Sequence, residues 1–495
     1  MIVVDSRWRA LGRVLGLVAL AVPAAVSLDG CTDSGSGDDL PTEVLSVCGD
    51  GVVEGAELCD DGNDDPRDDC TNTCAAPTCG DAVAAGGEAC DDADADDADS
   101  CTAACTLGPA AVASVAVGEF HSCAVSTSGV VRCWGAPDFG RLGQPGYSDP
   151  IGDDEPPSDW DPVDVADDVV ALAAGADHTC ALRAGGQLRC WGSNGMGQLG
   201  YGNTDDVGDD ETPASAGDVP LPAGVISVAG GTGHTCAVLE GGDVACWGNN
   251  NAGQLGTGAT ERIGDDETVD SSTFVSLPGP AVEVVAANEH SCARLQSGDV
   301  VCWGQGTNGQ LGYGSPDSIG DDEPADAAGV VPLGGPAVDI DAFYNHTCAV
   351  LEGGSVRCWG DGGSGRLGYG DDVDIGERKT PEEVGDVMLD EVALAVETGR
   401  SYTCATLANG NVRCWGNDVA FGVPDSSNSS TPDAPAQIGV PVRSLVAGYS
   451  HNCAILDSAA IACWGSNTGS VLGYPDVGSN TTVNNPASVG EVQVF

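Results

Sequence analysis

The strongest constraint on this chain is a set of fourteen cysteines that form seven pairs, the members of every pair being ten residues apart. A histidine or tyrosine stands two residues before each first cysteine, and each second cysteine opens a Cys-Trp-Gly tripeptide. The period is 56 or 57 residues, and 49 for the last interval. Repeats of this length are stacked supersecondary units, so residues 110–495 are expected to form one repeat domain. The pairs are Cys123 and Cys133, Cys180 and Cys190, Cys236 and Cys246, Cys292 and Cys302, Cys348 and Cys358, Cys404 and Cys414, and Cys453 and Cys463.

Each unit has the pattern of short strands joined by glycine-rich turns. In the second unit, the apolar runs are residues 169–174, 178–183 and 187–192. A hairpin turn centred on Gly185 would place Cys180 opposite Cys190, with Cα atoms about 4.5–5.5 Å apart, a separation that a disulfide accepts. The spacing therefore predicts one disulfide per unit. Buried free thiols acting as small apolar core residues are the alternative.

The repeated text resembles the RCC1 (regulator of chromosome condensation) family. The resemblance rests on Gly-Ala-Asp-His-Thr-Cys-Ala-Leu at 175–182, Gly-Gln-Leu-Arg-Cys-Trp-Gly at 186–192 and Gly-Gln-Leu-Gly at 197–200. It implies an all-β fold, a seven-bladed β-propeller with four-stranded blades. Tyr402 replaces the histidine in the sixth repeat, and repeats six and seven lack the Gly-Gln-Leu-Gly text.

A propeller must close its ring to hide its edge strands. The stretch from Pro486 to Val494 matches the Pro-x-x-Val segment that we expect to begin each first strand, as at Pro162 to Val165. The first repeat, starting at Ala110, lacks such a segment. We therefore predict that the C-terminal strand completes the first blade.

The charge balance excludes some partners. Aspartate and glutamate number 76 against 17 lysines and arginines, a formal charge of −59. Binding nucleic acid or an anionic membrane surface requires a basic face, so both are excluded as direct partners. An acidic surface favours a basic protein partner, bound cations or a salty medium. A solvated acidic surface with no specific partner is the alternative.

The N-terminus has the features of an export signal. Arg7, Arg9 and Arg13 precede an apolar run over 14–26 that is too short to span a bilayer. Leu28-Asp29-Gly30-Cys31 resembles the lipobox of bacterial lipoproteins, which implies a signal over 1–30 and lipidation of Cys31. Ordinary secretory cleavage near Ala25 is the alternative. Residues 31–47, rich in Ser, Gly and Asp, are expected to be a flexible tether.

Two small cysteine-rich modules follow, at 48–78 and 79–109. Their four cysteines have the same spacing in both copies, with a 31-residue period. Modules of this size need cross-links to fold, but the spacing leaves the connectivity open. The text from Cys48 to Asn63 resembles a cysteine-rich repeat of exported myxobacterial proteins. Of the 23 cysteines, Cys31 is then the one left without a disulfide partner.

Calcium is the only cofactor that the sequence suggests, because clustered carboxylates supply the oxygen ligands that it requires. One candidate set lies in the first cysteine-rich module and comprises Asp60, Asp61, Asn63 and Asp64. A second is the text Ile151-Gly152-Asp153-Asp154-Glu155, which recurs at Val207, Ile263 and Ile319. Structural or solvated turns are the alternative at these loops.

No catalytic site is predicted. The six histidines occupy equivalent positions in six repeats, which would place them too far apart to converge on one metal ion. We expect each histidine to bond the backbone of its own blade, and each Cys-Trp-Gly tryptophan to pack between blades. The propeller cysteines are all paired, and no serine nucleophile or phosphate-binding loop is recognisable.

The two residues before each histidine differ in every repeat, whereas the surrounding text barely changes. Equivalent loops gather on one face of a propeller, so these pairs predict a varied binding surface on a rigid base. Drift at exposed turns is the alternative. Trp160, in an enlarged loop, is a further candidate anchor. The partner-binding candidates are Glu119, Phe120, Asp177, Glu289, Tyr344, Asn345, Arg400, Tyr449 and Trp160.

These features predict a monomeric, non-enzymatic binding protein, either secreted or lipid-anchored at the outer membrane or cell surface. Its partner is expected to be a protein, and its contact with the membrane to be the lipid anchor alone. The RCC1 resemblance includes bacterial members that bind β-lactamases through one propeller face. The alternatives are guanine-nucleotide exchange, as in eukaryotic members, and carbohydrate binding or polysaccharide processing.

Overall fold

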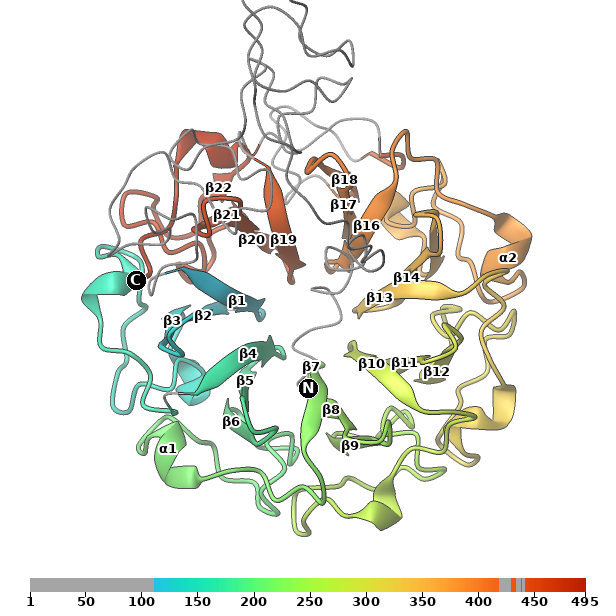
Figure 1. Cartoon of the computed structure of the whole chain (residues 1–495), viewed down its shortest axis with the longest axis horizontal. Coiled ribbons are helices and arrows are strands. Elements are labelled where there is room, and N and C mark those ends of the chain that lie inside the picture. Colours follow the sequence, from blue (N-terminus) through green and yellow to red (C-terminus); the bar gives the residue numbers. More distant parts are fainter. Residues whose placement is uncertain (1–110, 167, 418–428, 433–437, 439–440) are drawn as a thin grey trace, which may run out of the picture.

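Seven antiparallel sheets follow one another along the chain and stand around a central channel as the blades of a propeller (Figure 1). The computed structural model describes residues 111–166, 168–417, 429–432, 438 and 441–495. The predicted all-β, seven-bladed fold is confirmed. No helix within those ranges is long and apolar enough to cross a membrane.

Each blade contains three consecutive antiparallel strands, and only the seventh has a fourth named strand among the described residues. The blades comprise β1–β3 (Val112–Val117, His121–Ser126, Val131–Gly135), β4–β6 (Val169–Ala174, His178–Arg183, Leu188–Gly192), β7–β9 (Val225–Gly230, His234–Leu239, Val244–Gly248), β10–β12 (Ala281–Ala286, His290–Leu295, Val300–Gly304), β13–β15 (Ala337–Phe343, His346–Leu351, Val356–Gly360), β16–β18 (Ala393–Thr398, Tyr402–Leu407, Val412–Gly416) and β19–β22 (Val442–Ala447, His451–Leu456, Ile461–Ser466, Thr482–Val483).

Short helices connect the blades. They are α1 (Pro213–Ala216), α2 (Pro381–Val384) and the 3-10 turns η2 (Asp138–Gly140), η3 (Pro157–Asp159), η4 (Ser271–Thr273), η5 (Ala325–Ala328), η6 (Gly363–Gly365) and η8 (Pro486–Ser488). In place of the fourth strand implied by the RCC1 resemblance, each of blades one to six has an isolated bridge to the last glycine of Cys-Trp-Gly, as between Gly135 and Ile151, and blades three and five have a second bridge to the third strand.

The disulfides form where the hairpin geometry predicts them. In every blade the second and third strands pair so that the two cysteines face each other, with Cα atoms 4.0 or 4.1 Å apart. Gly186 turns the hairpin of blade two with a φ of 80°, a left-handed conformation that glycine adopts without a steric cost. All seven predicted disulfides are therefore confirmed. They join Cys123 to Cys133, Cys180 to Cys190, Cys236 to Cys246, Cys292 to Cys302, Cys348 to Cys358, Cys404 to Cys414 and Cys453 to Cys463.

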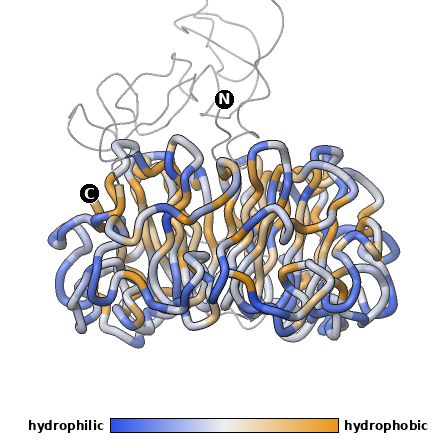
Figure 2. Tube along the Cα trace, turned by 90° about the horizontal axis from the view of Figure 1, so that it is seen from below, coloured by the Kyte–Doolittle hydropathy of each residue, from blue (hydrophilic) through white to orange (hydrophobic). Residues whose placement is uncertain are grey.

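The first strand of each blade lines the central channel, and residues from all seven first strands meet there. Outside these strands the sheets bury an apolar core, while polar loops cover both faces of the ring (Figure 2). The seven Cys-Trp-Gly tryptophans are fully buried within this core.

Neighbouring blades are joined by a repeated set of hydrogen bonds, which we call the blade lock. The Nε2 of His178 lies 2.9 Å from the hydroxyl of Thr235 in the next blade, and that hydroxyl donates to the carbonyl of Gln198. The indole of Trp247 donates to the same carbonyl at 2.9 Å. Because the hydroxyl gives its one proton to the carbonyl, Nε2 must be the donor of the histidine bond. The prediction that each histidine bonds its own blade is therefore wrong: its Nε2 bonds the hydroxyl of the following blade.

The blade lock recurs around the ring and also closes it. The histidine-to-hydroxyl distances are 2.7–3.0 Å at all six histidines. His451 of the last blade bonds Ser122 of the first, and Ser122 and Trp134 both donate to the carbonyl of Val471. In blade six, Tyr402 replaces the histidine and its hydroxyl reaches Asn452 of blade seven at 3.0 Å.

The predicted place of the C-terminal segment is wrong. Val492 pairs with Ile461 in the third strand of blade seven, its backbone N–H donating at 2.8 Å. The Pro-x-x-Val segment at 162–165 behaves in the same way, because Val163 donates to Val131 of blade one, the blade that precedes it in the chain. These segments therefore cover the outer side of a finished blade. Blade one already has its own first strand, β1, and needs no completion.

Candidate binding surface

The turns that join the first and second strands lie on one face of the ring, which we call the upper face. The loops that follow Cys-Trp-Gly lie on the same face, because their first residue donates to the turn, as Ala136 donates to Phe120 at 2.8 Å. Seven equivalent backbone bonds of this kind hold the two sets of loops together. The two varied residues before each histidine therefore lie directly above the blade lock.

Six of the seven turns converge on one cavity of about 200 Å³. Since its lining comes from blades on all sides, the cavity lies at the upper mouth of the channel. Among the predicted partner-binding residues, Glu119, Tyr344 and Tyr449 line it, together with Phe343. Contributions from three separate blades therefore meet at a single point.

Arg400 joins two of these residues into a stack. Its guanidinium carbon lies 4.4 Å from the ring centroid of Tyr449 and 5.3 Å from that of Tyr344. Both contacts are within the range of a cation–π interaction, which holds a flexible side chain in one orientation. The backbone carbonyl of Arg400 accepts a hydrogen bond from Arg366 at 3.1 Å. The structure brings together the three residues Tyr344, Arg400 and Tyr449, which we call the mouth stack.

A second cluster surrounds Arg141, next to the mouth on blade one. This side chain is only 3% exposed, and its Nη1 lies 2.8 Å from Asp177 of blade two. It also lies within cation–π distance of Phe120 and Phe139, at 5.8 and 5.5 Å. The cluster therefore contains two predicted residues, Phe120 and Asp177, linked through an arginine that was not predicted.

Glu119 interacts electrostatically with charged residues of both clusters. Partial burial raises its pKa above the ordinary value, and the Asp177 carboxylate raises it further. The positive charges of Arg400 and Arg141 oppose this rise. Glu119 is therefore a partly desolvated acid at the mouth, easier to protonate than a solvated glutamate.

The remaining predicted residues lie apart from the mouth stack. Glu289 accepts a 2.6 Å hydrogen bond from Gln305, the first residue after Cys-Trp-Gly in its own blade. Asn345 completes the turn after Tyr344, and its carbonyl accepts from Asp361. Trp160 lies beyond β3 on the outer side of blade one, where it donates to Glu155 at 2.5 Å and packs edge-on against Tyr147. Trp160 is thus a rim residue.

Sequence reasoning missed four upper-face residues in the Gly-Gln-Leu-Gly turns. Phe139 and Met196 occupy equivalent positions and are 52% and 36% exposed. Arg141 and Arg366 replace the glutamine of that turn and are almost buried. The signal was present, because the residue before the turn's first glycine varies between repeats as freely as the pre-histidine pair.

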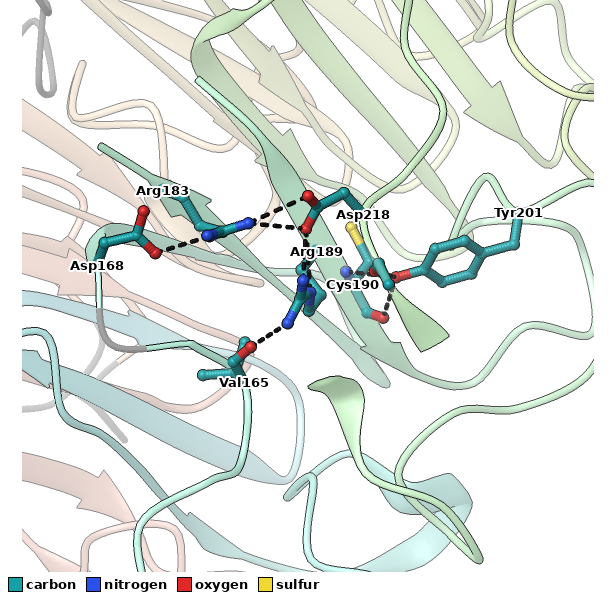
Figure 3. Close-up of polar contacts among 8 residues, drawn as sticks. Val165, Asp168, Arg183, Arg189, Cys190, Tyr201 and Asp218 are labelled. Carbon is teal, nitrogen blue, oxygen red and sulfur yellow. Dashed lines mark hydrogen bonds and ion pairs between the residues drawn. The ribbon is translucent and has the colours of Figure 1, made fainter. Parts of the chain in front are cut away.

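Arginines of blade two, away from the mouth, are held in ion pairs. In blade two, Arg183 bonds Asp168 at 2.7 Å and Asp218 at 3.1 Å, and Arg189 shares Asp218 (Figure 3). Nearby, the Tyr201 hydroxyl accepts from the Cys190 N–H and donates to its carbonyl, at 3.1 and 3.0 Å (Figure 3). These contacts cover the edge of a third strand and leave no free guanidinium there.

The six histidines are held in their neutral form. Burial lowers the pKa of His178 to about 4 and those of His234, His290 and His451 to about 3. Their Nε2 atoms are engaged in the blade lock, so they cannot serve as acid–base catalysts at neutral pH.

The acidic loops bring carboxylates together. In each of the four loops, such as Asp209, Asp210 and Glu211, oxygens of the three residues lie within 4.8 Å of one another. Burial, and a hydrogen bond that the protonated Glu211 donates to the Asp210 carboxylate, raise the pKa of Glu211 to about 7. A shared proton can therefore relieve the repulsion there, and calcium at these loops stays a prediction. Asp60, Asp61, Asn63, Asp64 and Cys31 lie outside the described residues.

Comparison with known families agrees with this architecture. The model of the regulator of chromosome condensation (RCC1) repeat matches residues 112–141, 169–198, 225–254, 281–310 and 338–366, and a second RCC1 repeat model matches 185–238. A domain of unknown function, DUF4215, matches residues 42–75, over the first cysteine-rich module.

Similar proteins include the ultraviolet-B receptor UVR8 of Arabidopsis thaliana, 28% identical over 67% of this chain and 71% of the receptor. The human E3 ubiquitin-protein ligase HERC2 is 30% identical over 51% of this chain, a match to only 5% of the ligase. Among solved structures, human WBSCR16 has a TM-score of 0.58 at 19% identity, covering 73% of this chain and 92% of that one. Prp20p of Saccharomyces cerevisiae has a TM-score of 0.54 at 20% identity, covering 70% and 83%. The described residues thus form an RCC1-like β-propeller, in which the first five repeats match the RCC1 repeat model.

Proposed function

We propose that this chain is an exported protein-binding module that captures a protein partner on the upper face of its propeller. The observation that carries this proposal is the contrast between adjacent positions. The blade lock is repeated around the ring, whereas the turns above it differ in all seven blades. A rigid base with a varied surface is the arrangement expected of a binding scaffold.

The side chains of the upper face suit a protein partner. Tyrosine and arginine, the types enriched at interface hot spots, form the mouth stack, and Phe120 and Phe139 adjoin it through Arg141. The overall charge of −59 would attract a partner with a basic surface over long distances.

Export and anchoring are part of the same proposal. The seven blade disulfides are typical of an oxidising compartment. With lipid on Cys31, the tether over 31–47 would hold the modules and the propeller at the outer membrane or cell surface. In cell fractionation, the protein should follow the membrane and the Cys31→Ser variant should not. A cytosolic protein with reduced thiols would contradict export and favour nucleotide exchange.

Affinity capture tests partner binding. The intact protein and a Phe120→Ala/Tyr344→Ala/Tyr449→Ala variant are incubated with exported proteins of the cell and of its surroundings. The variant should lose the captured protein while its melting temperature is unchanged, because the three side chains are partly exposed. Trp160→Ala, a change at the rim, is the matched control and should retain capture. Equal capture by the triple variant, or recovery of glycan alone, would contradict the proposal.

A further inference from the structure

We propose that the mouth stack recognises a carboxylate on the partner, an aspartate or glutamate side chain that pairs with Arg400. This inference rests on the proposed function and adds the chemistry of the contact. The three upper-face arginines, Arg141, Arg366 and Arg400, differ in their ion pairing.

Two of these arginines are already occupied. Arg141 is paired with Asp177 at 2.8 Å, and Arg366 with Asp361 at 3.2 Å, and both side chains are less than a tenth exposed. Arg400 differs, because it is only partly buried and, within the described part of the chain, no carboxylate lies within 4.0 Å of its guanidinium. The same residues offer its side-chain N–H groups no hydrogen-bond acceptor. With respect to the described residues, Arg400 therefore presents unused donors at the mouth.

The mouth stack limits what Arg400 can bind. The two tyrosine rings take up cation–π contacts with the guanidinium, which leaves the N–H edge as the free recognition element. A planar guanidinium edge matches a carboxylate through two parallel hydrogen bonds. The ordering cost is low because stacking already holds the side chain.

In blade five, the mouth stack includes a residue with a strained backbone conformation. Tyr344 has a φ of 53°, in the left-handed region that a tyrosine rarely adopts. In the same blade the first strand, β13, runs one residue further than other first strands, so that Phe343 pairs with His346 and Tyr344 enters a two-residue turn. Retained backbone strain at a mouth residue supports a binding role.

The opposite occupant, a cationic side chain, fits less well. Tyr344, Tyr449 and Glu119 line the cavity and could attract a cation, but Arg400 already occupies the tyrosine rings. A partner cation would have to displace Arg400 or lie beside a like charge. A partner with a basic surface can still contribute one carboxylate to this contact. Its net charge governs the long-range attraction, whereas the pairing with Arg400 depends on the local groups.

The test uses a library of random disulfide-cyclised peptides displayed on phage, selected on the intact protein. Selected peptides that compete with one another at the upper face should contain a required Asp or Glu. Changing it to Asn or Gln should weaken binding at least about tenfold, as expected for a desolvated charge pair. On the Arg400→Ala variant, the acidic peptide and its amide version should bind equally weakly.

Two further variants complete the design. Arg400→Lys keeps the charge but loses the planar edge, so it should bind the acidic peptide about tenfold less tightly. Arg183→Ala, in blade two away from the mouth, should bind as the unchanged protein does. Thermal melting checks that each variant is folded.

The outcomes separate the two proposals. Peptides that need the upper face but bind the Arg400→Ala variant with full affinity would overturn the carboxylate inference and leave the proposed function standing. Peptides whose required residue is Lys or Arg, with binding lost on Glu119→Gln, would also overturn it. A library that yields no binder to the upper face would count against both.

Discussion

Phe120 and His121 are neighbours in the chain, yet they belong to regions that tolerate change in opposite ways. His121 is fully buried and bonds Thr179 of the next blade at 2.7 Å, and the same contact recurs around the ring. Phe120 is one of the two varied turn residues before the histidine, which range from glycine to tyrosine across the blades. The difference teaches that the proposed binding surface lies one residue away in the chain from the contacts that support it.

A side-chain replacement in the blade lock strengthens this comparison. Where blade six has Tyr402 for histidine, blade seven has Asn452 for serine or threonine, and the two side chains meet at 3.0 Å. The lock changes by a matched pair across two blades. The turn residues differ in every blade, although the lock is the same in most of them.

The largest expected effect comes from breaking the blade lock at its largest buried member. Trp247→Ala removes a fully buried indole and its bond to the carbonyl of Gln198. The free energy of unfolding should fall by about 3–5 kcal/mol. Denaturant unfolding measures the loss, and Trp160→Ala, at the rim, should cost much less. Similar losses in the two variants would contradict the division between lock and rim.

Removing a histidine of the blade lock should have the next largest effect on stability. His234→Ala removes the 2.9 Å bond to Ser291 and should lower the unfolding free energy by about 1–3 kcal/mol. The double variant His234→Tyr/Ser291→Asn copies the natural pair of blades six and seven. Gly231 provides the space that Gly399 provides beneath Tyr402. The double variant should recover most of the stability, and a double variant no better than His234→Ala would refute the matched-pair account.

Lowering the pH should decrease the free energy of unfolding, because the buried histidines of the blade lock resist protonation in the folded state. The folded pKa of His234 is about 3, below the ordinary value of 6.5. The unfolded chain therefore binds more protons between these pH values, and stability falls as pH decreases from about 6.5 to about 3. The slope is about 1.4 kcal/mol per pH unit for each such histidine. Unfolding measured across this range should be shallower in the His234→Tyr/Ser291→Asn variant, and identical slopes would contradict the assignment.

Whether the sequence predicts a contact correctly depends on how far apart in the chain the two contacting residues lie. The disulfides are set by a local hairpin count, so their pairing was predicted correctly. The histidine contacts and the pairing of Val492 with Ile461 join residues from different repeats or from the end of the chain, and both were assigned wrongly. The cavity residues Glu119, Tyr344 and Tyr449 were found from their variability. Their meeting with Arg400 depends on side-chain packing between blades, which no spacing in the chain encodes.

A glycine in the turn of blade five should separate stability from binding. Tyr344→Gly relieves the left-handed strain at this position but removes one ring of the mouth stack. The melting temperature should stay the same or rise, because glycine adopts a φ of 53° freely and the expected gain is within about 1 kcal/mol. Binding of the acidic cyclic peptide should weaken. A clear loss of stability would show that Tyr344 belongs to the scaffold instead.

The smallest expected effect concerns Glu119, which lies near the mouth stack with the same sign of charge as the inferred partner group. Burial and Asp177 raise its pKa, and Arg400 and Arg141 lower it. Glu119→Gln removes a negative charge, so the acidic cyclic peptide should bind a few times more tightly at neutral pH, a gain of up to about 1 kcal/mol. In the unchanged protein the affinity should rise as pH falls through the raised pKa of Glu119, and the Gln variant should lack this rise. Titration calorimetry at two pH values measures both effects. Weaker binding to Glu119→Gln would mean that Glu119 helps to hold the partner, and that the mouth reads a cation.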